Sequence, residues 1–187
     1  MVNEDEIIKK ILKGNPAEFS RLYDAYIDKI YRFVFFKTRH KETAEDLTSD
    51  IFIKALSKIQ TFNPDKASFS VWLYRIARNT VIDHYRTRKV TLNIEDAWDI
   101  VSPDNVADQA HANLSLRQVE QYIQKLKPEQ RDLVVLRVWE DLSYKEISEI
   151  MNKGENSLKI AFSRIMRTMR KDIGPIAMVT FYLINRI

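Results

Sequence analysis

Apolar residues recur at spacings of three and four along most of this chain, and no useful length of it alternates apolar with polar residues. The first pattern is typical of amphipathic helices, and the second, which is missing, is typical of half-buried strands. Glycine, which weakens helices more than any residue except proline, occurs only three times. The sequence therefore predicts an all-α fold.

Length and composition bound the number of domains and the compartment. A chain of 187 residues, 45% of them hydrophobic, is long enough for two small helical domains with a core each. The chain has no cysteine, which excludes disulfides, thiolate zinc sites and a cysteine nucleophile. Residues 1–6 lack the basic start and apolar core of a signal peptide, so we expect a cytoplasmic protein.

Residues 1–90 predict a first domain with three main helices. Asn15 and Glu18 fit a capping box at the start of the first helix, Thr43 is a candidate cap for the second, and Ser68 or Ser70 for the third. The faces expected to be buried comprise Phe19, Leu22, Tyr23, Tyr26, Ile27, Ile30, Phe33 and Val34 in the first helix, and Leu47, Ile51, Ala55, Leu56 and Ile59 in the second.

The third helix of this domain, residues 71–90, is strongly basic and follows a predicted turn at residues 63–65, Asn-Pro-Asp. Helical spacing gathers its apolar side from Leu73, Ile76, Ala77, Thr80 and Val81. Its other side carries Arg75, Arg78, Asn79, Ile82, Asp83 and Arg86. Two interpretations stay open: a surface that meets nucleic acid, or a solvated basic helix with a core stripe.

Charge is distributed unevenly, although 30 Lys and Arg nearly balance 26 Asp and Glu over the chain. Residues 71–90 and 153–172 are mainly basic, while residues 91–112 hold only acidic charges, at Glu95, Asp96, Asp99, Asp104 and Asp108. Weak periodicity and Ser-Pro-Asp at residues 102–104 predict that this middle segment is a flexible, exposed linker. Trp98 and Ile100 within it could rest on the protein itself or dock on a partner.

Residues 113–173 predict a second helical domain with a helix-turn-helix. Pro128 opens one helix, Ser143 and Glu146 form a capping box for another, and Gly154 is expected to end the turn before the last. That last helix turns Leu158, Phe162, Ile165, Met166 and Met169 inward, and Lys159, Ser163, Arg164, Arg167 and Arg170 outward. The outward face suits phosphates and base edges, although basic helical hairpins also occur in proteins that touch no DNA.

Several motifs, in order along residues 15–172, together resemble one family. They are Leu22-Tyr23 with Tyr26, AEDLT at residues 44–48 followed by DIF at 50–52, WLYRIARN at 72–79 with Ile82-Asp83, LKPEQR at 126–131 and LSYKEI at 142–147. The chain resembles the extracytoplasmic-function (ECF) group of RNA polymerase sigma factors, which retains only regions two and four. The resemblance implies a region-two-like domain at residues 1–90, a linker at 91–112 and a region-four-like domain at 113–173.

The resemblance also implies three contact surfaces. The clamp coiled coil of core RNA polymerase would be bound by Asp46, Leu47, Asp50 and Phe52. The opened non-template strand of the minus-ten promoter element would be bound by Asn63, Arg75, Arg78, Asn79, Asp83 and Arg86, with Tyr74 and Tyr85 as lesser candidates and Trp72 packed between helices. The minus-thirty-five duplex would be bound by Lys159, Ser163, Arg164 and Arg167. An anti-sigma factor, often membrane-bound for relatives, is a further partner that the sequence leaves open.

Two positions depart from the usual pattern of this family. Ser49 stands where the family generally has Gln, within the expected polymerase contact. NSLKIA at residues 156–161 replaces the more usual GTVKSR, so Lys159 is kept while an Arg has become Ala161. The promoter sequence therefore does not carry over from relatives, and Arg164 and Arg167 are the candidates to compensate.

Residues 174–187 form an apolar C-terminal tail after Gly174-Pro175. The apolar run is shorter than the roughly twenty residues that a membrane-crossing helix needs. It could complete the core of the second domain or dock on a regulator, and both interpretations stay open.

No catalytic residue, metal site, cofactor or small-molecule substrate is expected. His40, His84 and His111 are scattered, and no Gly-rich phosphate loop is present. Asp46 and Asp50, one helical turn apart, could share a divalent ion as in a nuclease, but a docking face is favoured. The main alternative function is a free-standing helix-turn-helix transcription regulator that does not join the polymerase, and the motif at residues 46–52 argues against it.

Overall fold

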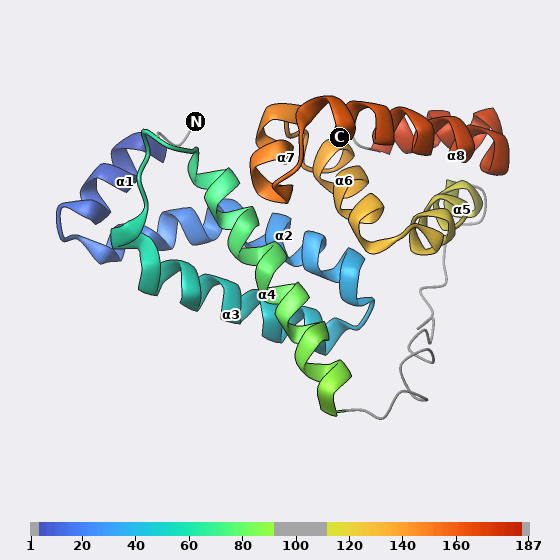
Figure 1. Ribbon diagram of the computed structural model, residues 1–187. Coiled ribbons are helices and arrows are strands. Elements are labelled where there is room, and N and C mark those ends of the chain that lie inside the picture. Colours follow the sequence, from blue (N-terminus) through green and yellow to red (C-terminus); the bar gives the residue numbers. More distant parts are fainter. Residues whose placement is uncertain (1–3, 92–111, 185–187) are drawn as a thin grey trace. The chain divides into compact units, whose positions relative to one another are not determined.

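Helices occupy nearly all of the part of the chain that the computed structural model describes, which comprises residues 4–91 and 112–184 (Figure 1). They are α1 (Glu4–Leu12), α2 (Phe19–Thr38), α3 (Lys41–Lys58), α4 (Phe69–Thr91), α5 (Ala112–Lys125), α6 (Pro128–Val138), α7 (Tyr144–Met151) and α8 (Glu155–Ile184), with short 3-10 turns η1 (Pro16–Glu18) and η2 (Ile59–Thr61). Over these ranges there is no strand. The all-α prediction is confirmed.

The chain divides into two compact units, Met1–Val101 and Ser102–Ile187. The first contains α1 to α4 and the second α5 to α8. The predicted linker, including Trp98 and Ile100, lies outside the described residues except for its two ends. Among the described residues, no helix is long and apolar enough to cross a membrane.

The core of the first unit lies where α2, α3 and α4 pack against one another, while α1 covers α2 and η2. Phe33 of α2 is fully buried and meets the ring of Tyr74 of α4 edge to face, with 5.5 Å between ring centroids. Edge-to-face pairs of this kind stabilise a core beyond the area that they bury. The predicted inward face of α2 is confirmed except at Tyr23, which is exposed, and at Ile27, which is half-buried.

Two helix starts in the first unit differ from prediction. Asn15 makes no side-chain cap bond, and the Glu18 carboxylate pairs with Arg21 at 3.3 Å instead of completing a capping box. The cap of α3 is His40 rather than Thr43, because the left-handed Arg39 (φ 55°) ends α2 and leaves His40 extended. Its Nδ1 atom accepts the Thr43 amide at 3.3 Å, so Thr43 lies inside the first turn.

The second unit is built on α8, which packs against α5, α6 and α7. The Tyr122 hydroxyl of α5 donates to the Ile165 carbonyl of α8 at 3.5 Å. Burial, helped by the nearby Asp172 carboxylate, raises the pKa of Tyr122 and so favours this protonated donor. From Glu155 to Ile184, α8 runs unbroken past Gly174 and Pro175. The side chains beyond Ile173 are not described, so both interpretations of the tail stay open.

The helix-turn-helix prediction is confirmed by α7, the turn at residues 152–154 and α8. The capping box is present: the Ser143 amide donates to the Glu146 carboxylate at 2.8 Å, and the Glu146 amide donates to Ser143 Oγ at 3.2 Å. The left-handed residue that ends α7 is Asn152 (φ 53°). Gly154 ends the turn as predicted, because its carbonyl accepts the Leu158 amide at 3.1 Å at the start of α8.

Replacing Ser143 by alanine is expected to lower the free energy of unfolding of the second unit by about 1 kcal/mol, because a helix start loses its side-chain acceptor. Urea denaturation followed by hydrogen exchange of the α7 amides measures the change. The control is Ser157→Ala, an exposed serine of α8 that should stay within about 0.5 kcal/mol of the unmodified chain. Equal effects of the two changes would contradict a stabilising cap.

Candidate nucleic-acid and partner-binding surfaces

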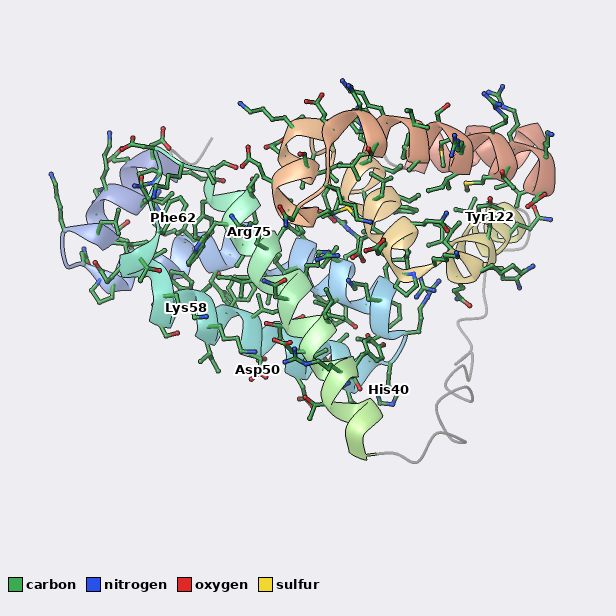
Figure 2. The ribbon with its side chains drawn as sticks, viewed as in Figure 1. His40, Asp50, Lys58, Phe62, Arg75 and Tyr122 are labelled. Atoms are coloured by element: carbon green, nitrogen blue, oxygen red, sulfur yellow. The ribbon has the colours of Figure 1, made fainter. Side chains whose placement is uncertain are left out.

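Helix α4 buries one side and exposes a basic side, as its spacing predicts. Ser68 precedes the helix and caps it, because its Oγ accepts the Val71 amide at 3.4 Å, so Ser70 is not the cap. Leu73, Ala77, Thr80 and Val81 are buried and Ile76 is half-buried. The opposite side exposes Asn79, Ile82, Asp83 and Arg86, while Arg78 is half-buried. Arg75 is exposed on the same side (Figure 2).

The polar groups on this outer side of α4 are available for a partner. Within the described part of the chain, the Arg75 and Asn79 side chains make no hydrogen bond or ion pair. Arg86 pairs with Asp83 at 3.1 Å, and both side chains are exposed. An exposed pair of this kind is worth less than about 1 kcal/mol, so a phosphate can replace Asp83 at little cost.

Aromatic rings pack at the start of α4. Trp72 lies 5.3 Å from Phe62 and 5.7 Å from Phe69, measured between ring centroids. Trp72 is half-buried, and these two partners lie in the adjoining loop and in α4 itself, so its packing between helices stays a prediction. In the adjoining loop, Asn63 Oδ1 accepts the Asp65 amide at 2.9 Å, which confirms the predicted turn and leaves the Asn63 residue exposed.

The two tyrosines that were lesser candidates for DNA contact both serve the fold. Tyr74 is only 1% exposed and packs on Phe33, so the prediction that it contacts DNA directly is wrong. The half-buried Tyr85 donates its hydroxyl to the Lys37 carbonyl at 3.1 Å. Both side chains attach α4 to α2.

The predicted polymerase-binding residues of α3 separate into two groups. Asp46 and Asp50 are exposed, and neither makes a hydrogen bond or ion pair within the described ranges. Leu47 and Phe52 are 6% and 4% exposed, and the Phe52 ring packs on Tyr23 with 4.8 Å between centroids. Leu47 and Phe52 therefore hold α3 in place, while the two carboxylates face solvent.

Sequence reasoning missed the apolar part of this α3 surface. Ile53 is 65% exposed, and Leu56 and Tyr23 are exposed as well, so the prediction that Leu56 is buried is wrong. Asp46, Asp50, Ile53 and Leu56 follow one another at spacings of four, three and three, which places them on one helical stripe. That spacing was the available signal. We call the exposed set of Tyr23, Asp46, Asp50, Ile53 and Leu56 the α3 face.

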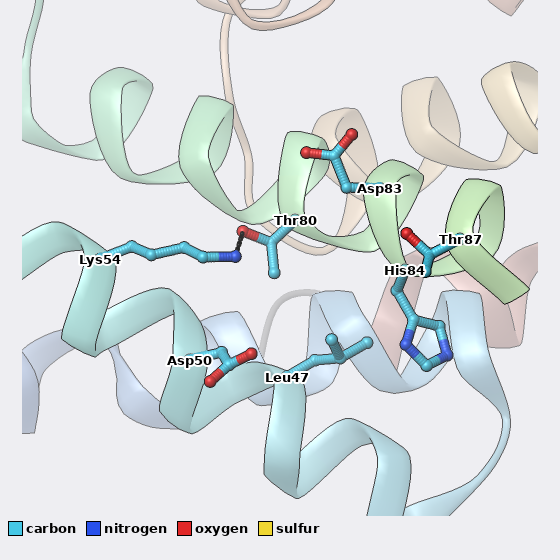
Figure 3. Close-up of a pocket in the computed structure, with 7 residues that line it drawn as sticks. All are labelled: Leu47, Asp50, Lys54, Thr80, Asp83, His84 and Thr87. Carbon is cyan, nitrogen blue, oxygen red and sulfur yellow. Dashed lines mark hydrogen bonds between the residues drawn. The ribbon is translucent and has the colours of Figure 1, made fainter.

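A groove runs between α3 and α4 beside this face (Figure 3). It is lined by Leu47, Asp50 and Lys54 of α3 and by Thr80, Asp83, His84 and Thr87 of α4. Lys54 Nζ donates to Thr80 Oγ1 at 3.3 Å, so the ammonium group bridges the helices instead of pairing with Asp50. No cluster of three potential ligands that could hold a metal ion occurs in the described segments, so the Asp46–Asp50 metal interpretation gains no support.

The predicted outward face of α8 is exposed at Lys159, Ser163, Arg164 and Arg167, which line a shallow depression together with Ile160. Lys159 pairs with Glu155 at 2.7 Å, and its Nζ atom lies 5.8 Å from the centre of the Tyr144 ring. The Arg164 and Arg167 side chains make no ion pair or hydrogen bond within residues 112–173 or elsewhere in the described chain. We call this set of five residues the α8 face.

Two arginines of α6 donate hydrogen bonds that join α6 to α5 and to the turn before α7. Arg131 of α6 donates to the Gln124 carbonyl at 2.6 Å and to the Ile123 carbonyl at 3.3 Å, which satisfies the end of α5. Arg137 donates to the Leu142 carbonyl at 2.9 Å and lies over the Tyr144 ring, 5.3 Å from its centre. The Arg131 contacts join α6 to α5, and the Arg137 contacts join α6 to the turn before α7 and to the first residue of α7.

Two family models match the chain, one on each unit. Sigma-70 region 2 matches residues 22–91, and Sigma-70 region 4 matches residues 116–169. The order and positions of these regions, with a basic helix in each, define a sigma factor of the sigma-70 class, a transcription initiation factor.

Curated relatives identify the group within this class. The ECF RNA polymerase sigma factor SigW of Bacillus subtilis is 33% identical over 89% of this chain and 94% of its own. The ECF sigma factor BldN of Streptomyces coelicolor is 34% identical over 89% of this chain and 64% of its own length. The chain belongs to the ECF RNA polymerase sigma factors, as its motifs predict.

Solved structures show the same fold. The sigma factor RpoE of Bartonella quintana, solved with the anti-sigma factor NepR, gives a TM-score of 0.67 at 22% identity. The match covers 82% of this chain and 95% of that one.

Proposed function

We propose that this protein binds core RNA polymerase in the cytoplasm and directs promoter recognition, DNA opening and transcription initiation, while the chemistry stays with the polymerase. The observation that carries the proposal is the α3 face, an exposed acidic and apolar surface in a chain that also has two basic helices. A free-standing regulator would bind DNA through the basic helices, but that function does not account for the exposed α3 face.

The α3 face fits a partner helix that combines cations with apolar side chains. Ile53 and Leu56 lose exposed apolar area on docking, which is favourable at roughly 25 cal/mol per Å². Asp46 and Asp50 have no internal partner to give up within the described residues, so binding cations there breaks no existing ion pair. We assign this face to the clamp coiled coil of the largest polymerase subunit, with the buried Leu47 and Phe52 in supporting positions.

The basic side of α4 fits the opened strand of the minus-ten element. Opened DNA presents both phosphates and unstacked bases, and proteins bind such strands with cations beside aromatic or polar groups. Arg75 and Asn79 are exposed next to the half-buried Trp72. Arg78, Asp83, Arg86 and Asn63 complete the proposed contact, and Arg86 exchanges its partner Asp83 for phosphate.

The α8 face fits duplex DNA of the minus-thirty-five element. Recognition helices of this motif lie in the major groove with their first turns against base edges. Lys159, Ser163, Arg164 and Arg167 occupy the second to fourth turns of α8 and are all exposed. We also propose an anti-sigma factor as a regulatory partner, since RpoE of known structure is bound to one; such a partner could hold the protein at the membrane.

Capture of core RNA polymerase by the tagged chain tests the function, with Asp50→Arg as the diagnostic variant. We expect capture and promoter-dependent initiation by the unmodified chain, and an affinity at least tenfold lower for Asp50→Arg, because like charges then meet at the interface. The matched control is Asp28→Arg, which reverses an exposed carboxylate on α2 outside the α3 face.

Three outcomes separate the possible conclusions. If Asp50→Arg keeps the affinity of the unmodified chain, as Asp28→Arg should, the α3 face is wrongly assigned. No capture by the unmodified chain, together with retained binding of duplex DNA, would instead favour the free-standing regulator. Loss of capture in both variants would point to a general charge effect.

A further inference from the structure

An isolated apolar side chain lies in the middle of the α8 face. Ile160 is 53% exposed and lines the same depression as Lys159, Ser163, Arg164 and Arg167. The buried side of α8 is formed by Leu158, Ile165 and Met169, and Ile160 lies two residues from Leu158, on the opposite side of the helix. The fold of the second unit therefore does not use this side chain.

The surroundings of Ile160 indicate what kind of partner covers it. Ile160, Ser163, Arg164 and Arg167 follow at spacings of three, one and three, so they share one stripe of the helix. The guanidinium groups of Arg164 and Arg167 have no anionic partner within the described residues. A partner that satisfies these cations is anionic, and the same partner must offer Ile160 an apolar group.

Duplex DNA meets both requirements in its major groove. Phosphates line the groove, and the only apolar group that a base edge presents there is the C5-methyl group of thymine. Ile160 lies in the second turn of α8, within the N-terminal part of a recognition helix that reaches base edges. A protein surface, by contrast, would have to supply several carboxylates around one aliphatic contact.

We propose that Ile160 contacts the C5-methyl group of a thymine in the major groove and is a specificity-determining residue of this protein. The inference rests on the proposed binding of duplex DNA by α8. In this proposal, the cations of the α8 face attract the DNA and orient it on the helix. Ile160 provides the preference for thymine at one position. Ala161, the next residue along the helix, gives Ile160 no long cationic neighbour on that side.

Deoxyuridine differs from thymidine only by lacking this methyl group, so it tests the contact directly. A duplex is first selected from a random library by the full-length chain, and each thymidine is then replaced by deoxyuridine, one at a time. We expect replacement at one position to lower the affinity roughly fourfold, the effect of losing one buried methyl-sized group. For Ile160→Ala, that duplex and its deoxyuridine form should bind equally. Lys13→Ala, at an exposed residue of the first unit outside every proposed binding surface, should keep the full difference.

The outcomes distinguish this inference from the function on which it rests. If a duplex is selected but no deoxyuridine replacement weakens binding, or if Ile160→Ala keeps the difference, Ile160 does not read a thymine methyl group. If Ile160→Ala also lowers polymerase capture, the residue contacts a protein surface. If the unmodified chain selects no duplex at all, duplex binding by α8 fails, and the thymine contact fails with it.

Discussion

Replacing Phe33 by alanine is expected to lower the free energy of unfolding of the first unit by about 3–5 kcal/mol. Phe33 is fully buried between α2 and α4, and its ring supports Tyr74 at a centroid distance of 5.5 Å. The truncation loses the burial of the ring and leaves a cavity that the packed helices close only in part. Because domains of this size are stable by only about 5–15 kcal/mol, polymerase capture should fall as well.

Native-state hydrogen exchange measures this effect unit by unit in the intact chain. Amides of α2, α3 and α4 should exchange faster in Phe33→Ala, while those of α7 and α8 keep their rates. The control Ile53→Ala truncates an exposed residue of the same unit and should change stability by no more than about 0.5 kcal/mol. Faster exchange in all helices would contradict the separate cores of the two units.

The double change Arg164→Ala with Arg167→Ala should lower affinity for duplex DNA roughly 100-fold, since each such contact is worth about 1–3 kcal/mol. Both guanidinium groups are exposed on the α8 face and have no ion-pair partner in the described chain. If each meets a phosphate, the slope of log affinity against log salt should also fall by nearly two, at about 0.9 per phosphate. Fluorescence anisotropy over a range of salt concentrations measures both quantities.

A charge-matched control separates contact from net charge in this experiment. Lys9→Ala with Lys13→Ala removes the same charge from exposed positions of the first unit. That variant should keep nearly the full affinity and salt slope. If both double variants lose affinity equally, the duplex is bound by the general positive charge of the protein rather than by the α8 face.

Features set by short sequence windows were predictable. Ser143 and Glu146 form their capping box as expected because both bonds join residues three apart. The Asn63 turn has the same origin, since its side chain bonds two residues ahead. The order of helices, the basic side of α4 and the polar residues of the α8 face also followed from periodicity, because helical spacing alone decides which residues share a side. Ile160 was not among the residues predicted to face outward.

Features that depend on neighbouring helices were not predictable. Tyr74 sits in a basic segment, yet α4 packs against both α2 and α3, which widens its buried side to include this ring. Leu56 lies on the side of α3 that no described helix covers, so its apolar character did not bring burial. The His40 cap required Arg39 to adopt the left-handed conformation, a choice that the sequence does not show for a non-glycine residue.

The division into two separately packed units also affects how tightly the chain holds DNA. Under the proposed function, each unit contributes one contact, and once the first is made, the second becomes intramolecular, at an effective concentration on the order of millimolar. Neither contact then needs to be strong alone. Weak exposed ion pairs, such as Arg86 with Asp83 and Lys159 with Glu155, can re-form when DNA dissociates. The affinity for DNA is therefore high while both units are bound during initiation. Once one unit has dissociated, the other binds only with its own low affinity, so the chain dissociates quickly.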